Sequence, residues 1–331
     1  MKVAVLDDWF DTLRHLPCFR HLDGFDVDVF TDHVTETAAL VERLKDYDAI
    51  TLFRERTAIT AELVEQLPRL KLISQRSVYP HIDIDACTKH GVLVCSNLHG
   101  STPPYAAAEH TWALIMAGMR DLPQQMASLQ KGEWQIGVGK TLNGRVLGLY
   151  GYGRIAKQVA IYAKAFGMKV VWWGSEDGRA RAQADGETIA SNRHAFFAEP
   201  DVVSVHVRMK AETKGLITAE DLGAMRHDAL FVNTSRAGLI EKEALLTALN
   251  NGQPGRAAVD VFDQEPITWA DDPLACHPHI IATPHIGFVT EDELDMQFSD
   301  IFEQVAAFHQ GQPKHMINPE VLEKTLAGNA I

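Results

Sequence analysis

The chain has 331 residues, of which 46% are hydrophobic and 23% are charged, and its formal net charge is −13 at neutral pH. This length exceeds what one ordinary hydrophobic core organises and predicts two domains. The acidic balance argues against a nucleic-acid surface, which needs clustered lysine and arginine, and it means that an anionic substrate must be bound by local positive groups. No apolar run approaches the ~18 residues of a membrane span.

The N-terminal residues Met1–Asp8 hold a short apolar run that ends in two acids, which predicts a strand and not a signal peptide. The four cysteines have no paired or zinc-type spacing and the fifteen histidines are scattered, so we expect no metal site. These features predict a cytoplasmic protein with reduced cysteines.

About the first hundred residues alternate short apolar runs with helical patterns. The predicted strands are Lys2–Leu6, Asp26–Phe30, Ala49–Phe53, Lys71–Ser74 and Val92–Cys95. Such alternation predicts a parallel sheet with helices on both faces, here a flavodoxin-like substrate domain.

Two prolines, Pro103 and Pro104, precede a predicted long helix from Tyr105 to about Arg120. A second array follows, and its six strands match a complete Rossmann unit. These strands are Val146–Tyr150, Lys169–Trp173, Val202–Val207, Ala229–Asn233, Ala257–Phe262 and Ile280–Thr283. A last helical stretch, about Glu291 to Gln310, is predicted to cross back onto the first domain.

The predicted fold class is therefore α/β with two doubly wound domains. Residues 1–100 plus 290–331 form the flavodoxin-like domain, and residues 101–289 form the Rossmann domain. A cleft between the two domains is the expected ligand site.

The segment from Arg145 to Ala156 predicts a strand, a glycine turn and the start of a helix, and its small residues fit the pattern G-x-G-x-x-G/A. Gly151 permits the tight turn, Gly153 lets the backbone approach a pyrophosphate, and Ala156 lets the helix pack closely on the strand. The helix N-terminus then offers free N–H groups to the phosphates. This motif predicts a dinucleotide cofactor.

The choice between NAD and NADP depends on the end of the second strand, where an acid usually binds the ribose hydroxyls. Here that position is Gly174, followed by Ser175. Loss of the acid removes a repulsion against a 2′-phosphate, which Arg179 and Arg181 are placed to bind. Glu176 argues the other way, because it repels a phosphate, and the alternative is that it accepts the ribose hydroxyls from a shifted position. We expect NAD, with NADP left open.

Three strand ends of the second array carry the candidate reactive groups, which are Arg236, Glu265 and His285. The carboxyl ends of parallel strands are where ligands bind in open α/β sheets. Hydride transfer between a secondary alcohol and a nicotinamide requires a proton to move, and a histidine suits that role. A carboxylate orients the imidazole, and an arginine can bind a substrate carboxylate with two hydrogen bonds.

The chain resembles the D-isomer-specific 2-hydroxyacid dehydrogenases over nearly its whole length. The motifs that carry the resemblance are Arg54–Thr60, His81–Asp83, Ala108–Leu114, Gly151–Ile155, Asn233–Arg236, Asp260–Pro266 and Pro284–Gly287. The resemblance implies an oxidoreductase that moves a hydride between NAD(P) and a D-2-hydroxy acid or its 2-keto acid. It implies that Arg236 orients the substrate, that Glu265 is the partner of the histidine, and that His285 is the general acid and base.

The resemblance also implies further contacts to the cofactor. Arg154 and Ile155 would lie over the pyrophosphate, and Val207 and Thr234 would line the cofactor with their backbones. Asp260 would lie near the nicotinamide carboxamide, and Gly287, at the end of the last motif, is expected to contact the cofactor. The family further implies a homodimer built through the Rossmann domain, including the helix at 103–120.

The loop before His81 departs from the family, which usually has glycines there to hold the substrate carboxylate. Arg76 and Val78 replace the expected glycines, with Ser77 between them. The backbone is still expected to approach the substrate, with Arg76 adding a positive group and Tyr79 an aromatic wall. The alternative is that these two side chains point outward.

Arg54 is a further candidate for binding an anionic substrate tail, and its alternative is a surface salt bridge with Glu55 or a neighbour.

Two other functions fit the scaffold, namely a dinucleotide-sensing corepressor or redox sensor and a phosphite-type dehydrogenase. The presence of all three reactive groups favours the enzyme. The substrate is left open among glyoxylate, hydroxypyruvate, 3-phosphoglycerate and bulkier acids.

Overall fold

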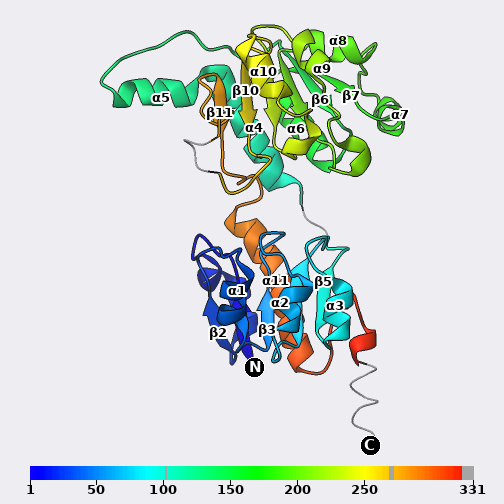
Figure 1. The fold of residues 1–331 in the computed structure, drawn as a ribbon. Helices are drawn as coiled ribbons and strands as arrows, with labels where there is room; N and C mark the ends of the chain where they lie inside the picture. The colour runs from blue at the N-terminus through cyan, green and yellow to red at the C-terminus, as the bar shows by residue number, and fades with distance from the viewer. Residues whose placement is uncertain (101–102, 268–271, 323–331) are drawn as a thin grey trace, which may run out of the picture. The chain divides into compact units, whose positions relative to one another are not determined.

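The computed structural model describes residues 1–100, 103–267 and 272–322. The chain forms two compact units, Met1–Thr102 with Thr290–Ile331, and Pro103–Val289 (Figure 1). Each unit contains one parallel sheet, which confirms the predicted α/β class. Among the described residues, no helix is both long enough and apolar enough to cross a membrane.

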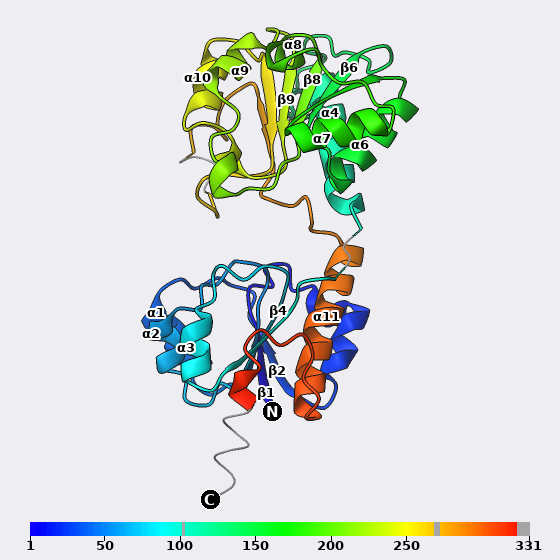
Figure 2. The same ribbon diagram turned by 90° about the vertical axis from the view of Figure 1, so that its right-hand side faces the viewer.

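The first unit has a five-stranded sheet in the order β2-β1-β3-β4-β5, which is the flavodoxin-like order. Its strands are β1 Lys2–Val5, β2 Asp26–Val29, β3 Ala49–Thr51, β4 Leu72–Arg76 and β5 Leu93–Asn97. Its helices are α1 Thr37–Leu44, α2 Ala61–Glu65, α3 Ile84–Lys89 and α11 Glu291–His309, with short 3-10 helices at Leu13–His15 and Pro17–Leu22. Figure 2 shows α1, α2 and α3 on one face of this sheet and α11 on the other.

Helix α11 completes the first unit although it comes from the far end of the chain. Phe298 packs on Phe53, with ring centroids 5.0 Å apart, and the hydroxyl of Ser74 donates to the carbonyl of Ile301 at 2.7 Å. The side-chain amide of Gln304 donates to a backbone carbonyl of β4 at 3.1 Å. Segments more than two hundred residues apart in sequence therefore share one core.

The second unit has a six-stranded sheet in the order β11-β10-β9-β8-β6-β7. Its strands are β6 Val146–Tyr150, β7 Lys169–Trp173, β8 Val202–Val205, β9 Leu230–Asn233, β10 Arg256–Val259 and β11 Ile280–Ala282. Its helices are α4 Tyr105–Arg120, α5 Leu122–Gln130, α6 Arg154–Ala165, α7 Glu176–Ala184, α8 Arg193–Ala198, α9 Ala219–Ala224 and α10 Ala244–Asn250, with 3-10 helices at Ala211–Thr213 and Ala237–Leu239.

These six strands are the predicted ones, but a seventh segment completes the Rossmann order. Ile189 pairs in parallel with Trp172 of β7 through a single bridge. The amide of Trp172 donates to the carbonyl of Thr188 at 2.9 Å, and the amide of Ala190 donates back at 3.1 Å. Counting this bridge as the third strand gives the order 3-2-1-4-5-6, with β11 added at the edge. The sheet therefore reverses its winding at β6.

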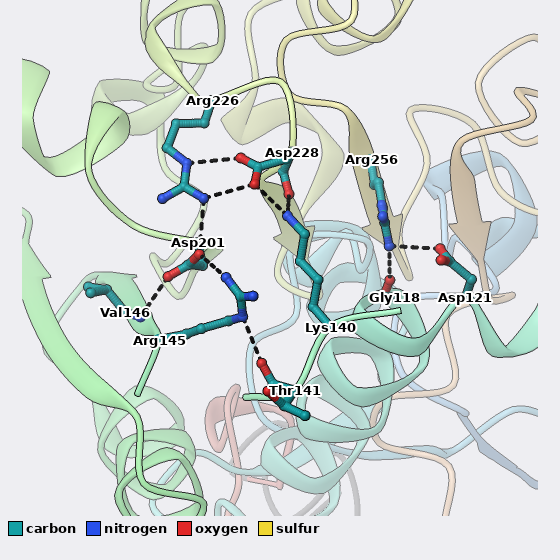
Figure 3. Close-up of polar contacts among 10 residues, drawn as sticks. All are labelled: Gly118, Asp121, Lys140, Thr141, Arg145, Val146, Asp201, Arg226, Asp228 and Arg256. Carbon is teal, nitrogen blue, oxygen red and sulfur yellow. Dashed lines mark hydrogen bonds and ion pairs between the residues drawn. The ribbon is translucent and has the colours of Figure 1, made fainter. Parts of the chain in front are cut away.

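Ion pairs tie together the amino ends of the strands in the second unit, the edge opposite the predicted reactive groups (Figure 3). Asp201, just before β8, accepts from Arg145 at 2.7 Å, from the amide of Val146 at 2.9 Å and from Arg226 at 3.1 Å. Asp228, just before β9, pairs with Lys140 at 2.6 Å and with Arg226. This network fixes the starts of β6, β8 and β9 relative to one another.

Candidate active site

The glycine turn after β6 has a backbone that only glycine adopts easily. Gly151 has φ +107°, and a Cβ there would lie 2.4 Å from the carbonyl oxygen of His206. Gly153 has ordinary extended backbone, and a Cβ there would meet no described atom within 4 Å. Packing within the chain therefore does not require Gly153, whereas close approach of a pyrophosphate does. Ala156 is fully buried where α6 meets the sheet.

The predicted cofactor residues Arg154 and Ile155 form the first turn of α6, directly after Gly153. Val207 also lies at this turn, because its side chain would be 3.2 Å from a Cβ on Gly151. These placements put the predicted pyrophosphate contacts around one turn at the carboxyl end of β6.

The end of β7 combines a glycine with two guanidinium groups. Gly174 has φ +149°, and its carbonyl accepts from Arg179 at 2.7 Å. The guanidinium of Arg179 lies 4.4 Å from the ring centroid of Trp173, and Arg181 donates to the carbonyl of Tyr152 at 3.4 Å. Ser175 caps α7 by accepting from the amide of the helix's third residue. Two guanidinium groups therefore lie near the strand end where an acid would bind the ribose, while α7 begins there with Glu176.

His285 and Glu265 are in direct contact. Nδ1 of His285 lies 2.6 Å from Oε2 of Glu265, and Oε1 of Glu265 accepts from the amide of Phe262 at 2.9 Å. Burial alone would raise the pKa of Glu265, but the hydrogen bonds from His285 and Phe262 and the nearby charge of Arg236 outweigh it and lower the pKa. An ionised Glu265 can only accept hydrogen bonds, so Nδ1 of His285 carries the proton in this contact. Nε2, the other ring nitrogen, takes no part in it.

Arg236 stands on a turn held by its neighbours after β9. The side-chain amide of Asn233 donates to the carbonyl of Arg236 at 2.9 Å, and its oxygen accepts from the amide of Ser235 at 3.0 Å. The side chain of Arg236 is exposed, and its charge acts on Glu265. The structure therefore brings the three predicted reactive groups to one edge of the sheet.

Asp260 is almost completely buried, with 1% exposure, and its two oxygens accept from this chain's own groups. Oδ1 accepts from the amide of Ile286 at 2.9 Å and from the hydroxyl of Thr283 at 2.6 Å, and Oδ2 accepts from the amide of Gly287 at 2.8 Å. Burial raises the pKa of Asp260, but hydrogen bonds from His110 and Thr283 reverse this and the net shift is downward. The predicted contact of Asp260 with a carboxamide stays a prediction.

Sequence reasoning missed two contacts that α4 makes with the strand ends. Nε2 of His110 lies 3.0 Å from the hydroxyl oxygen of Thr283, and the hydroxyls of Thr111 and Thr234 are 2.7 Å apart. The only signal in the sequence was that two adjacent polar residues, His110 and Thr111, interrupt the apolar pattern of a predicted core helix. Their partners lie more than 120 residues away, so only the fold reveals them.

The predicted substrate residues of the first unit lie after β3 and β4. Arg54 has φ +58°, and its guanidinium is 3.6 Å from Oε1 of the buried Glu293, so it forms an ion pair with α11. Ser77 has φ +77°, and its amide donates to the carbonyl of Asn97 at 3.2 Å. Val78 is 54% exposed, whereas Tyr79 is half-buried against the core.

Arg76 does not present its charge at the surface of the first unit. Its side chain is 6% exposed, and its Nε donates to Asp300 of α11 at 2.6 Å. A Cβ on Gly100 would lie 2.5 Å from the guanidinium, so the loop after β5 packs directly on it. The predicted substrate role of Arg76 stays a prediction that this placement does not favour.

A pocket of about 370 Å³ lies at the amino edge of the second sheet. Its lining includes Gly118, Asp121, His227 and Arg256. Among the described residues, none of those predicted to act on cofactor or substrate lines it. The candidate active site therefore lies at the strand ends and not at this pocket.

The second unit, with its glycine turn after β6, defines a dinucleotide-binding protein of the Rossmann class. Residues 112–287 match the profile of a family described as D-isomer specific 2-hydroxyacid dehydrogenase, NAD binding domain. The chain belongs to this family.

Relatives of known name agree with that assignment. A D-3-phosphoglycerate dehydrogenase of Bacillus subtilis is 36% identical over 82% of this chain and 51% of its own length. A glyoxylate reductase of Korarchaeum cryptofilum is 32% identical over 91% of this chain and 92% of its own. The chain thus spans about half the length of the phosphoglycerate dehydrogenases it matches.

A solved structure is also similar over nearly the whole chain. It is a putative D-3-phosphoglycerate dehydrogenase oxidoreductase from Ralstonia solanacearum. The two chains are 43% identical with a TM-score of 0.91, and the match covers 97% of this chain and 98% of that one.

Proposed function

We propose that this chain is an NAD(P)-dependent oxidoreductase that transfers a hydride between its nicotinamide cofactor and a D-2-hydroxy acid or the corresponding 2-keto acid. The observation that carries the proposal is the 2.6 Å contact between His285 and Glu265, beside the charge of Arg236. Family membership and the glycine turn at Gly151 support it.

The bound cofactor supplies the hydride, and the residues of the chain bind the acid and move the proton. In the reductive direction, Arg236 binds the substrate carboxylate through two charge-assisted hydrogen bonds. Nε2 of His285 donates its proton to the oxygen of the carbonyl as that oxygen gains negative charge. Glu265 orients the ring through Nδ1 and stabilises the charged imidazole before the transfer. In the oxidative direction, Nε2 accepts the hydroxyl proton.

We propose that Arg54, Ser77, Val78 and Tyr79 form the part of the substrate site that the first unit contributes. The left-handed backbones at Arg54 and Ser77 support this role, because such conformations cluster at ligand sites. Arg76 acts in our proposal through its ion pair with Asp300, which fixes the same loop.

The cofactor is NAD in this proposal, in agreement with the family, and NADP is a second candidate at the same site. Arg179 and Arg181 beside Gly174 favour acceptance of a 2′-phosphate, whereas the exposed Glu176 opposes it.

The test is a panel of 2-keto acids, including glyoxylate, hydroxypyruvate and 3-phosphohydroxypyruvate, each assayed with NADH and with NADPH. We expect turnover of at least one acid and a higher kcat/KM with NADH. Binding of either cofactor without turnover of any acid would contradict the enzyme and favour a dinucleotide sensor on the same scaffold.

We further propose a homodimer formed through the second unit. Leu122, Met126 and Leu129 have the spacing of one helical stripe on α5, and they are 45%, 63% and 61% exposed. Trp134 and Val138 in the following segment are also exposed. Large apolar side chains exposed together on one helix and the segment after it are typical of a protein interface. The second copy is the partner that the family implies.

We infer a cytoplasmic location. Cys18, Cys87 and Cys95 are buried free thiols inside the first unit. Cysteines that stay reduced suit a reducing compartment.

A further inference from the structure

We propose that helix α4 positions the catalytic groups, because its consecutive residues His110 and Thr111 each hold one of the two loops that carry His285 and Arg236. The inference rests on the proposed function for its kinetic readouts, but its spectroscopic readout is independent of turnover. His110 and Thr111 are positioning residues in this account, since neither is assigned a contact with substrate.

The loop that carries His285 is held by a hydrogen bond from His110, and the geometry places the proton of this bond on Nε2. The ionised carboxylate of Asp260 only accepts, so the single hydroxyl proton of Thr283 goes to Oδ1 at 2.6 Å. The oxygen of Thr283 must then accept from Nε2 of His110 at 3.0 Å. The same Nε2 lies 3.2 Å from Oδ1 of Asp260. Nε2 of His110 therefore carries a proton and bridges both groups.

This bridge bears directly on His285. Thr283 lies two residues before it, and the amide of His285 donates to the carbonyl of Thr283 at 3.0 Å. The two amides after it, of Ile286 and Gly287, both donate to Asp260. His285 itself has φ +53°, a conformation that a residue with a Cβ keeps only when its surroundings enforce it.

The second loop is held by Thr111, which is completely buried. Its hydroxyl donates to the carbonyl of Ala107 at 2.7 Å, so the hydroxyl of Thr234 must be the donor in their 2.7 Å contact. Two residues later in this turn comes Arg236, and Ser235 between them donates to the carbonyl of Val205 at 2.7 Å. The turn is thus anchored to α4 on one side and to β8 on the other.

Close packing fixes α4 against the strand that leads into this turn. A Cβ on Gly118 would lie 2.8 Å from the side chain of Leu230 in β9, so the helix lies directly on the strand. Both anchors therefore come from one helix whose position relative to the sheet is set by its own packing.

The decisive test reads the tautomer of the His285 ring by nitrogen NMR of histidine-labelled protein. In the wild type we expect the Nδ1–H form, fixed by Glu265. His110→Phe removes the donor but keeps a ring, and the expected result is a mixture of tautomers at His285. His110→Gln replaces the donor and should restore the wild-type spectrum.

Thr283→Val removes the other partner of the same hydrogen bond. It keeps the test valid if His110→Phe fails to fold. We expect it to give the same mixture of tautomers. An unchanged Nδ1–H tautomer in folded His110→Phe and Thr283→Val would overturn the proposal.

Steady-state kinetics distinguishes the effect of His110 from that of Thr111. His110→Phe should lower kcat about tenfold or more, because a misplacement of ~1 Å can cost about 10²-fold. Thr111→Val should instead raise the KM of the keto acid about fivefold, the scale of one lost hydrogen bond, while Thr111→Ser restores it. Equal effects of both variants on kcat and KM would indicate a general loss of stability and contradict the two separate anchors.

The outcomes also distinguish this inference from the function on which it rests. A wild type that reduces no 2-keto acid contradicts the proposed function, and the tautomer at His285 still decides the role of His110. An active wild type with unchanged tautomers in the variants contradicts the inference alone.

Discussion

Three residues proposed to act on the substrate, Arg54, Ser77 and His285, have positive φ although none is a glycine. Each such backbone costs free energy, on the order of 1–3 kcal/mol, unless its surroundings enforce it. Ion pairs and hydrogen bonds to α11, β5 and Asp260 provide that support. The strain directs each side chain to a place that relaxed backbone would not give it.

We expect His285→Ala to lower kcat by roughly 10²–10⁴-fold with the fold retained, because general acid–base catalysis is lost. Steady-state kinetics with the best keto acid measures this change. His90→Ala, at an exposed histidine of the first unit, is the matched control and should retain wild-type kcat. Near-wild-type kcat in folded His285→Ala would remove His285 from the proposed role.

The lowered pKa of Glu265 predicts how its contribution to stability depends on pH. A carboxyl whose pKa is depressed on folding stabilises the protein above its unfolded pKa of ~4.3, and this contribution disappears as pH falls through the folded value. Glu265→Gln should therefore lower Tm at neutral pH and cease to do so in strong acid. A Tm difference that grows on acidification would contradict the assigned ionised state.

At the scale of the elements, the strands were predicted well because buried parallel strands consist of continuous apolar runs. The bridge at Ile189 was missed because it contains one apolar residue between polar neighbours, and it forms only beside β7. The pair of His285 and Glu265 was predictable from strand ends. The anchors His110 and Thr111 were not, because their function depends on where α4 crosses the sheet.

Asp201 tests the ion pairs at the amino edge of the second sheet. Burial raises its pKa, but the amide of Val146 and the charges of Arg145 and Arg226 lower it overall. Asp201→Asn should reduce the free energy of unfolding by about 1–3 kcal/mol at neutral pH, as hydrogen bonds to a charged group are lost. The deficit should shrink as pH falls through the depressed pKa, as followed by denaturant titration. A deficit independent of pH would contradict the role of the charge.

At the scale of the whole molecule, the first unit needs residues from both ends of the chain, since α11 supplies Phe298 and the partners of Arg54 and Arg76. The return of α11 was predicted from a helical pattern without a following strand. Its ion pairs were not, because charged residues on a helix surface do not reveal their partners in sequence.

Leu129→Glu should convert the proposed dimer into a monomer, because it places a charge in the apolar stripe of α5. Light scattering coupled to size-exclusion chromatography measures the mass of each species, with 36.7 kDa expected for one chain. Gln130→Glu adds the same charge beside the stripe and should stay dimeric. A monomeric wild type would contradict this interface.

In the proposed reaction, a hydride is transferred stereospecifically to the C2 carbon of a keto acid and His285 supplies the proton. The most direct measurement is reduction of the best keto acid by NADH that carries deuterium at the transferable position, followed by chiral analysis and mass spectrometry. We predict a D-2-hydroxy acid with one deuterium at C2, formed by the wild type and barely by His285→Ala. An L product, or a product without deuterium, would contradict the account.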